Sequence, residues 1–337
     1  MMVWSLYFAA SAQGEKAKKE AGKISGLAFG DYYFVSNQHD SSIEGMNGFW
    51  FRRIYFTYDQ KIDPPFAIRF RVEAKSPGDF KTNDTLNPFV KDAYLQYTQG
   101  RHSVYFGLIP TPTWDTLETL VGYRPVERAP LDLYKMGEAR DTGIAFRGFL
   151  DVEKTTGYAI MVGNGSGTKA ETDKGKAFYM SLSHRFSPRL YLEGYTDFWD
   201  KPGNQDWNTI HGFLVYQTPK SRVSALFAWQ SRKRTGQSDL QLNVASFYVD
   251  HAVSVKIRPF FRWDHVSDPV PDADKIAYLP MANHARPAFY MVGVDFAASP
   301  GVHIIPNIEM VKYSSPTSGA IPDNDLYFKA TVYFVWK

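Results

Sequence analysis

Cysteine is absent from the 337 residues of the chain, so neither a disulfide framework nor a metal site with cysteine ligands can form. No apolar run reaches the roughly 20 residues that a transmembrane helix requires, and membrane-spanning helices are therefore excluded. The chain also lacks a strong excess of either charge, because 38 Lys and Arg against 35 Asp and Glu leave a net charge of only +3. So small a charge does not indicate a nucleic-acid partner.

Aromatic residues, by contrast, are abundant. They make up 16% of the chain, with 21 Tyr, 25 Phe and 8 Trp, yet the mean hydropathy is negative. This combination is typical of a β-barrel whose outward side chains are apolar and whose inward side chains are polar. A soluble all-β protein of ordinary composition also fits.

The last thirteen residues, DLYFKATVYFVWK (325–337), alternate without a break. Successive side chains of a strand point to opposite faces, so one face of this strand is wholly apolar. In a soluble sandwich that face would meet the core, and in an outer-membrane barrel it would meet lipid. The apolar face consists of Leu326, Phe328, Ala330, Val332, Phe334 and Trp336.

Near its start the chain has an apolar run, residues 3–10, and the small residues Ala10 and Ala12 form an A-x-A pattern at its end. This pattern predicts that residues 1–12 are the remnant of an export signal. The alternative is a frayed hydrophobic strand. We expect residues 13–23 to be a periplasmic N-terminal segment and residues 24–337 to form the barrel.

Alternating segments of about ten residues recur along the chain, bounded by Gly, Pro, Asn, Asp and Ser. No long helical pattern lies between them, which excludes α/β folds, since parallel strands need a crossover helix. The sixteen predicted strands are residues 24–35, 48–61, 65–75, 88–98, 101–109, 141–150, 155–163, 176–186, 189–198, 207–217, 221–230, 240–249, 253–265, 288–298, 302–313 and 325–337.

The connections between these segments alternate between long and short. Long connections therefore gather at one end of the sheet and short turns at the other, an asymmetry that outer-membrane barrels show and sandwiches do not. The fold class we predict is all-β. It is a closed antiparallel transmembrane β-barrel of about 16 strands, with short periplasmic turns, long extracellular loops and an aqueous lumen.

Two details of the strands resist a regular barrel. Pro259 and Pro306 lie inside predicted strands, where proline cannot donate a ladder hydrogen bond, and we expect bulges there. Adjacent Arg52 and Arg53 cannot both face the lumen of a regular strand. We expect Arg52 to lie near a membrane interface.

Charged residues on inward faces are the candidates for a selective pore. In residues 65–75, Phe70 and Val72 belong to the apolar face, so Arg69, Arg71 and Glu73 point inward. The inward residues that we predict to line the pore are Arg53, Arg69, Arg71, Glu73, Asp92, Arg147, Lys256, Arg258 and Arg262.

The third long connection, residues 110–140, is rich in both apolar and charged side chains. Exposing its apolar surface to water would be unfavourable, so we predict that it folds into the lumen and narrows it. Its acids would then face Arg53, Arg69 and Arg71; alternatively, these charges only hold the loop in place. The constriction residues are Trp114, Asp115, Glu118, Tyr123, Arg124, Glu127 and Arg128.

No catalytic or metal-binding constellation is found, and we predict no cofactor. The run GNGSGTK (163–169) lacks the spacing of a phosphate loop, and we predict that it is a flexible extracellular loop. The run DPVPDADK (268–275) lacks EF-hand spacing, and we predict that it is a solvated loop.

Several segments resemble the phosphate-selective porin O/P family. They are KDAYLQY (91–97), VYFGLIPTPTWDTLE (104–118), GEARDTGIAFRG (137–148), IRPFFRWDHVSD (257–268) and MVGVDFAASPGVHIIPNIE (291–309). The resemblance implies a sixteen-stranded outer-membrane porin, commonly trimeric, with a constricting third loop. It also implies a ladder of basic residues for anion selectivity, in which Arg53, Arg69, Arg71 and Arg262 are candidates, although Glu73 and Asp92 sit among them.

We therefore expect a passive, weakly anion-selective diffusion channel in the outer membrane of a Gram-negative-type bacterium. Its expected partners are membrane lipid, further copies in a homotrimer, and small polar solutes or anions in transit. The alternatives are a barrel with a structural, adhesin or lipid-acting role, and a soluble sandwich.

Overall fold

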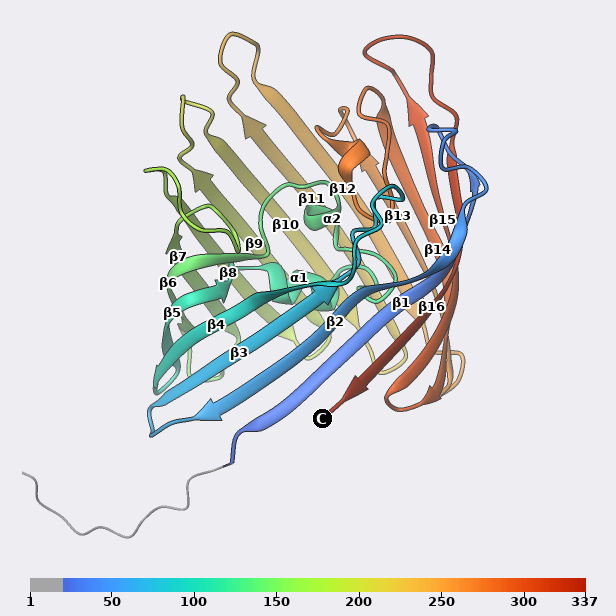
Figure 1. Cartoon of the computed structure of the whole chain (residues 1–337). Coiled ribbons are helices and arrows are strands. Elements are labelled where there is room, and N and C mark those ends of the chain that lie inside the picture. Colours follow the sequence, from blue (N-terminus) through green and yellow to red (C-terminus); the bar gives the residue numbers. More distant parts are fainter. Residues whose placement is uncertain (1–20) are drawn as a thin grey trace, which may run out of the picture.

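One sheet closes on itself to form the molecule. The computed structural model describes residues 21–337, in which sixteen antiparallel strands form a closed barrel (Figure 1). The first strand pairs with the last, and every other pair joins neighbours in sequence. The predicted fold class is thus confirmed. The predicted signal remnant (1–12) and residues 13–20 lie outside the described residues.

The strands correspond one to one with the sixteen predicted segments. They are β1 (Lys23–Asn37), β2 (Asn47–Lys61), β3 (Phe66–Lys75), β4 (Asn87–Gln99), β5 (His102–Pro110), β6 (Arg140–Phe149), β7 (Thr156–Gly163), β8 (Ala177–Ser187), β9 (Leu190–Trp199), β10 (Trp207–Gln217), β11 (Ser221–Arg232), β12 (Leu240–His251), β13 (Ile257–Val266), β14 (Arg286–Ser299), β15 (Val302–Ser314) and β16 (Asp325–Trp336).

Long loops gather at one end of the barrel and tight turns at the other, as predicted (Figure 1). The largest error in strand bounds concerns β13, which begins at Ile257 and not at residue 253. Lys256 therefore lies exposed in the turn before the strand instead of facing the lumen, and its prediction as a pore-lining residue is wrong.

The apolar face of each strand points away from the lumen. In β16, Phe328 and Val332 are exposed on the outer surface, whereas Tyr327, Lys329 and Thr331 are buried inside. No second sheet covers the outer face within residues 21–337, so the soluble sandwich is contradicted. Between residues 21 and 337, no helix has the length and apolar character needed to span a membrane.

A β-bulge in β2 determines the side of the barrel on which Arg52 lies. Phe29 pairs with Arg53, but the next residue, Gly30, pairs with Phe51, so Arg52 is an extra residue without an opposite partner. An extra residue shifts the alternation by one position. Arg52 and Arg53 are consequently both buried inside the barrel, and the expectation that Arg52 lies near an interface is wrong.

The two strand prolines do not produce bulges. Pro306 pairs with Ala330 of β16. On the side of β14, Asn307 and Ile304 are each paired with that strand, the two residues between them are not, and the register is the same before and after this gap. Pro259 pairs with Val294, and the ladder between β12 and β13 stops just before it. The missing donor is thus accommodated by a gap in one ladder, and the predicted bulges are wrong.

Two loops fold into the barrel. The third loop carries α1 (Trp114–Leu120) and α2 (Pro130–Leu133), and both helices lie within the ring of strands (Figure 1). The connection between β13 and β14, with the 3-10 helix η1 (Ala273–Lys275), buries Val270, Ile276 and Leu279 in the same apolar cluster. The interpretation of residues 268–275 as solvated therefore holds only for exposed side chains such as Lys275.

Gly107 in β5 gives a test of the backbone geometry. Its φ is +126°, and a Cβ there would lie 2.3 Å from the Ala93 carbonyl oxygen. We expect Gly107→Ala to lower the free energy of unfolding in detergent micelles by about 1–3 kcal/mol, because side chains disfavour this conformation. The unfolding midpoint followed by circular dichroism measures the change.

Gly194 in β9 is the matched control, since a Cβ there meets no atom within 4 Å and its φ is not positive. Gly194→Ala should change stability by no more than about 0.5 kcal/mol. Equal losses in both variants would contradict the strain assigned to Gly107.

Candidate pore constriction

Helix α1 separates its apolar and acidic side chains onto two faces. Trp114 and Leu117 are buried, and the helix ends at Val121, whose backbone is extended while its N–H still donates to the Leu117 carbonyl oxygen at 2.9 Å. Asp115 and Glu118, also three residues apart, share the other face. The first face packs on the barrel wall, and the second lines a cavity.

Apolar packing holds the third loop against the far wall of the lumen. The Tyr123 ring stacks on Phe260 with centroids 4.8 Å apart, and its hydroxyl donates to the Asp295 carboxylate. Burial and the charge of Asp295 raise the pKa of Tyr123, so its hydroxyl stays protonated as the donor. The loop residues in this cluster include Trp114, Leu117, Val121, Val126, Leu131, Leu133 and Tyr134, and the wall residues include Phe213, Val215, Tyr248 and Phe289.

A buried charge cluster ties the same loop to β1 and β2. The Arg52 guanidinium lies 3.4 Å from Asp31 and 3.4 Å from Glu127, and it also donates to the Val126 carbonyl oxygen. Burial would raise the pKa of Glu127, but the positive charges of Arg52 and Arg128 outweigh burial and hold it well below its usual range. Glu127 is therefore ionised and serves as an anchor.

Arg262 belongs to this support and not to the pore. It is fully buried, pairs with Asp264 at 2.5 Å, and donates to the Arg128 carbonyl oxygen of the loop above it. Arg128 in turn donates to the Ala277 carbonyl oxygen at 2.6 Å and so joins the two inward loops. The prediction that Arg262 lines the pore is wrong because the third loop covers it.

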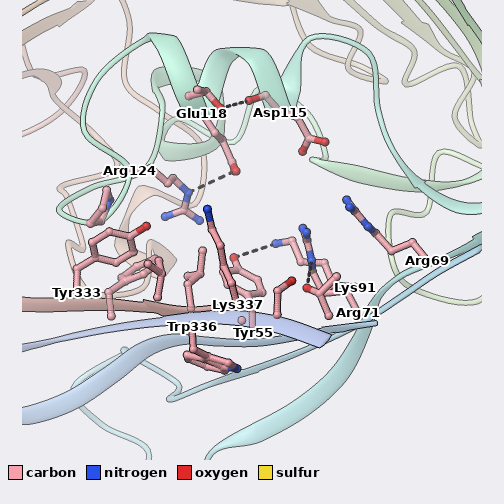
Figure 2. A pocket seen from close by; sticks show the side chains of 18 of the residues that line it. Tyr55, Arg69, Arg71, Lys91, Asp115, Glu118, Arg124, Tyr333, Trp336 and Lys337 are labelled. Atoms are coloured by element: carbon pink, nitrogen blue, oxygen red, sulfur yellow. Dashed lines mark hydrogen bonds and ion pairs between the residues drawn. The ribbon is translucent and has the colours of Figure 1, made fainter. Parts of the chain in front are cut away.

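A cavity of about 580 Å³ remains between α1 and the wall formed by β1 to β4 and β16 (Figure 2). Its strand wall is mainly basic, and Asp115 and Glu118 lie opposite on the loop. The charged and aromatic residues that line it are Phe29, Tyr55, Arg69, Arg71, Lys91, Asp115, Glu118, Arg124, Arg140, Tyr333, Trp336 and Lys337.

Acidic partners neutralise the two arginines of β3. Arg69 binds the Asp59 carboxylate with two hydrogen bonds, of 2.7 and 3.0 Å. Arg71 lies 3.1 Å from Asp92 and donates through Nε to the Thr57 hydroxyl at 2.9 Å. Both guanidinium groups are thereby fixed at the edge of the cavity with little net charge around them.

Glu73 and Asp92 lie behind the cavity wall and not on it. Glu73 accepts a hydrogen bond from Lys91 at 2.6 Å, and Arg53 lies 2.8 Å from it as an ion pair. Asp92 also binds Arg140, 2.5 Å away, and Arg140 reaches Asp115 of α1 at 3.0 Å. This last contact joins the wall to the loop at the edge of the cavity.

The structure thus brings five predicted residues together at the cavity, Arg69, Arg71, Asp115, Glu118 and Arg124, and places the others elsewhere. Arg147 donates to the Pro110 carbonyl oxygen and covers the Tyr105 ring at 5.2 Å. Arg258 pairs with Asp250 outside the cavity lining.

Lys91 is a lining residue that sequence reasoning missed. Arg71 pairs with Asp92 and Val72 with Val90, so Lys91 is the extra residue of a second bulge. A regular strand would have turned Lys91 away from Asp92. The signal available in the sequence was the adjacent charged pair itself.

The glycine-rich run 163–169 contacts a carboxylate of the protein itself, that of Asp141. The Asp141 carboxylate accepts hydrogen bonds from the Gly165 N–H at 2.7 Å, the Tyr179 hydroxyl at 2.8 Å and the Thr142 N–H at 2.9 Å. Gly165 therefore has a carboxylate of the protein as its hydrogen-bond partner in place of a phosphate. Within residues 21–337, no group of three or more acidic or histidine side chains is placed to hold a metal ion.

Solved structures show what the fold resembles. No protein-family model and no curated protein matches the sequence. The anion-selective porin from Comamonas acidovorans aligns over 94% of this chain and 99% of its own, with 11% identity and a TM-score of 0.69. OmpF of Salmonella typhi, solved with daunomycin, aligns over 94% and 97%, with 9% identity and a TM-score of 0.68.

OmpT of Vibrio cholerae aligns over 95% of this chain and 99% of its own, with 11% identity and a TM-score of 0.66, and another of its structures is described as a trimer form. At these identities the likeness shows a porin-type barrel fold. The narrower resemblance to phosphate-selective porins stays a prediction.

The anchor formed by Arg52 and Glu127 can be tested by replacing one or both charges. Arg52→Met or Glu127→Met alone should lower stability by about 3 kcal/mol, because each takes one of two partners away from a buried charge: Arg52 keeps only Asp31, and Glu127 keeps only Arg128. The double variant should regain most of that loss, since Asp31 keeps its bonds to Trp50 and Thr331. Chemical unfolding in micelles measures all three.

Lys81→Met serves as the control, because Lys81 pairs with Asp40 on the exposed surface and should contribute at most about 1 kcal/mol. Strictly additive losses at Arg52 and Glu127 would show that the two charges do not support one another.

Proposed function

We propose that the protein is a channel in the outer membrane of a Gram-negative-type bacterium, through which small hydrophilic solutes and ions diffuse passively. The observation that supports this most is the third loop, which crosses a closed barrel and leaves a cavity with basic side chains on the wall and acids on the loop. Opposed charges in a narrow passage orient polar solutes and select among ions.

The outward apolar face of the strands suits contact with lipid, because a closed barrel satisfies its backbone hydrogen bonds internally. The tight turns would then face the periplasm and the long loops the exterior. We infer a homotrimer as the assembled form. No step of this function requires a cofactor or a reaction.

The ion preference follows from how the basic residues are paired. Arg69, Arg71, Lys91 and Arg124 line the cavity, and each has a carboxylate partner, so the excess of positive charge is small. We therefore propose weak anion selectivity.

A second candidate function is a structural or adhesin barrel without a conducting pore. The packing of the third loop and of residues 267–285 inside the lumen favours it, because their apolar side chains fill much of the space beside β10 to β14. A lipid-acting barrel is a further alternative. Conduction separates the channel from both.

Planar bilayer recording tests the channel directly. The purified protein should insert and give ohmic conductance in potassium chloride, in proportion to salt concentration, because diffusion through water carries the current. Protein that inserts without conducting would overturn the channel and favour the structural barrel.

Reversal potentials in a salt gradient test the ion preference. The native protein should favour chloride weakly, and Arg69→Ala with Arg71→Ala should shift the reversal potential towards neutrality, because two positive groups leave the cavity wall. Arg258→Ala is the control, since Arg258 lies outside the lining. A native cation preference, or an unmoved potential in the double variant, would refute the role of these arginines.

A further inference from the structure

We propose that the cavity beneath α1 is a binding site for a small aromatic carboxylate, a flat ring bearing one negative charge. The inference rests on the proposed channel and names the class of solute that binds in it. Three features of the cavity support this choice: the donors that remain available on its arginines, the rings that lie beside those donors, and the small net charge of the lining.

The arginines present hydrogen-bond donors towards the same space. Arg71 donates through Nε to the Thr57 hydroxyl and lies with Nη1 3.1 Å from Asp92 as an ion pair, and within residues 21–337 its Nη2 has no hydrogen-bond partner. Arg69 uses Nε and Nη2 for Asp59, which leaves Nη1. Figure 2 shows these two guanidinium groups on one side of the cavity and Arg124 on another. A carboxylate entering between them would accept charge-assisted hydrogen bonds.

Aromatic rings lie beside the same donors. Arg71 Cζ is 5.7 Å from the Tyr55 ring centroid, and Arg124 Cζ is 5.5 Å from that of Phe29. Leu27 and Val335 add aliphatic surface to the lining. A hydrated inorganic ion makes no use of such surface, whereas a ligand ring gains from covering it. The lining therefore fits an organic anion with an apolar part.

The volume and the charge of the cavity further limit which class of ligand fits it. A volume of about 580 Å³ is within the range of sites for organic ligands and far exceeds what a single ion fills. Four of the basic lining residues are already paired with carboxylates, so a multiply charged anion such as phosphate would find little uncompensated positive charge. A single carboxylate is the better match.

Equilibrium binding to the purified barrel in micelles, measured by calorimetry, tests the site with sodium benzoate, acetate and phosphate as probes. Benzoate should bind about tenfold or more tightly than acetate, because its ring adds buried apolar contact. Phosphate should bind more weakly than benzoate.

Variants then assign the two parts of the ligand to residues. Arg71→Met should weaken benzoate about tenfold or more, and Arg71→Lys should restore part of the loss, because a charged donor is removed and then replaced. Tyr55→Leu should weaken benzoate about fivefold while leaving acetate unchanged. Arg258→Met, outside the cavity, should bind like the native protein.

Equal affinity for benzoate and acetate, tighter binding of phosphate, or native benzoate affinity in Arg71→Met would each overturn the proposal. Recording in bilayers separates it from the channel. Benzoate should interrupt the chloride current of the native protein and not that of Arg71→Met. A barrel that binds benzoate without conducting keeps the site and refutes the channel, and one that conducts but neither binds nor is blocked refutes the site alone.

Discussion

A charged side chain cannot face the outer surface of this barrel without a large desolvation cost, about 2–4 kcal/mol for an arginine at the middle of a bilayer. Regular strands alternate, so two adjacent charges would place one of them outside. The structure inserts an extra residue at Arg52 in β2 and at Lys91 in β4, and each bulge brings an adjacent charged pair inside together. The arrangement of the lumen depends on these two bulges.

The charges that the bulges turn inward have different roles along the barrel. Arg52 reaches Glu127 and holds the third loop against β1 and β2. Lys91 instead neutralises Glu73 beside the cavity, together with Arg53. The same physical device thus supports the loop at one position and sets the charge of the cavity wall at another. Among the charges of the third loop itself, Glu127 therefore supports the loop, whereas Asp115 and Glu118 face the cavity.

The sequence alone predicts the strands and the inward third loop, because alternation and loop length are local patterns that the closed sheet preserves. It cannot show where the register shifts, so it turned Arg52 outward and overlooked Lys91. It also placed Arg262 on the pore, since strand periodicity identifies the inward face but not the loop that covers it. The burial of Val270 was missed because its segment is rich in Asp and Pro, as solvated loops are.

Helix α1 explains how one short segment can both narrow the lumen and keep a polar surface. Trp114 and Leu117 bury one face against the wall, while Asp115 and Glu118 present the other to the cavity. Because the buried face supplies the packing, changes on the acidic face alter the charge of the cavity with little loss of apolar contact. A change at Asp115 is the exception. Arg140 binds both Asp92 and Asp115 and so ties the acidic face of the helix to the barrel wall. This one arginine therefore contributes both to the attachment of the loop and to the charge of the cavity lining.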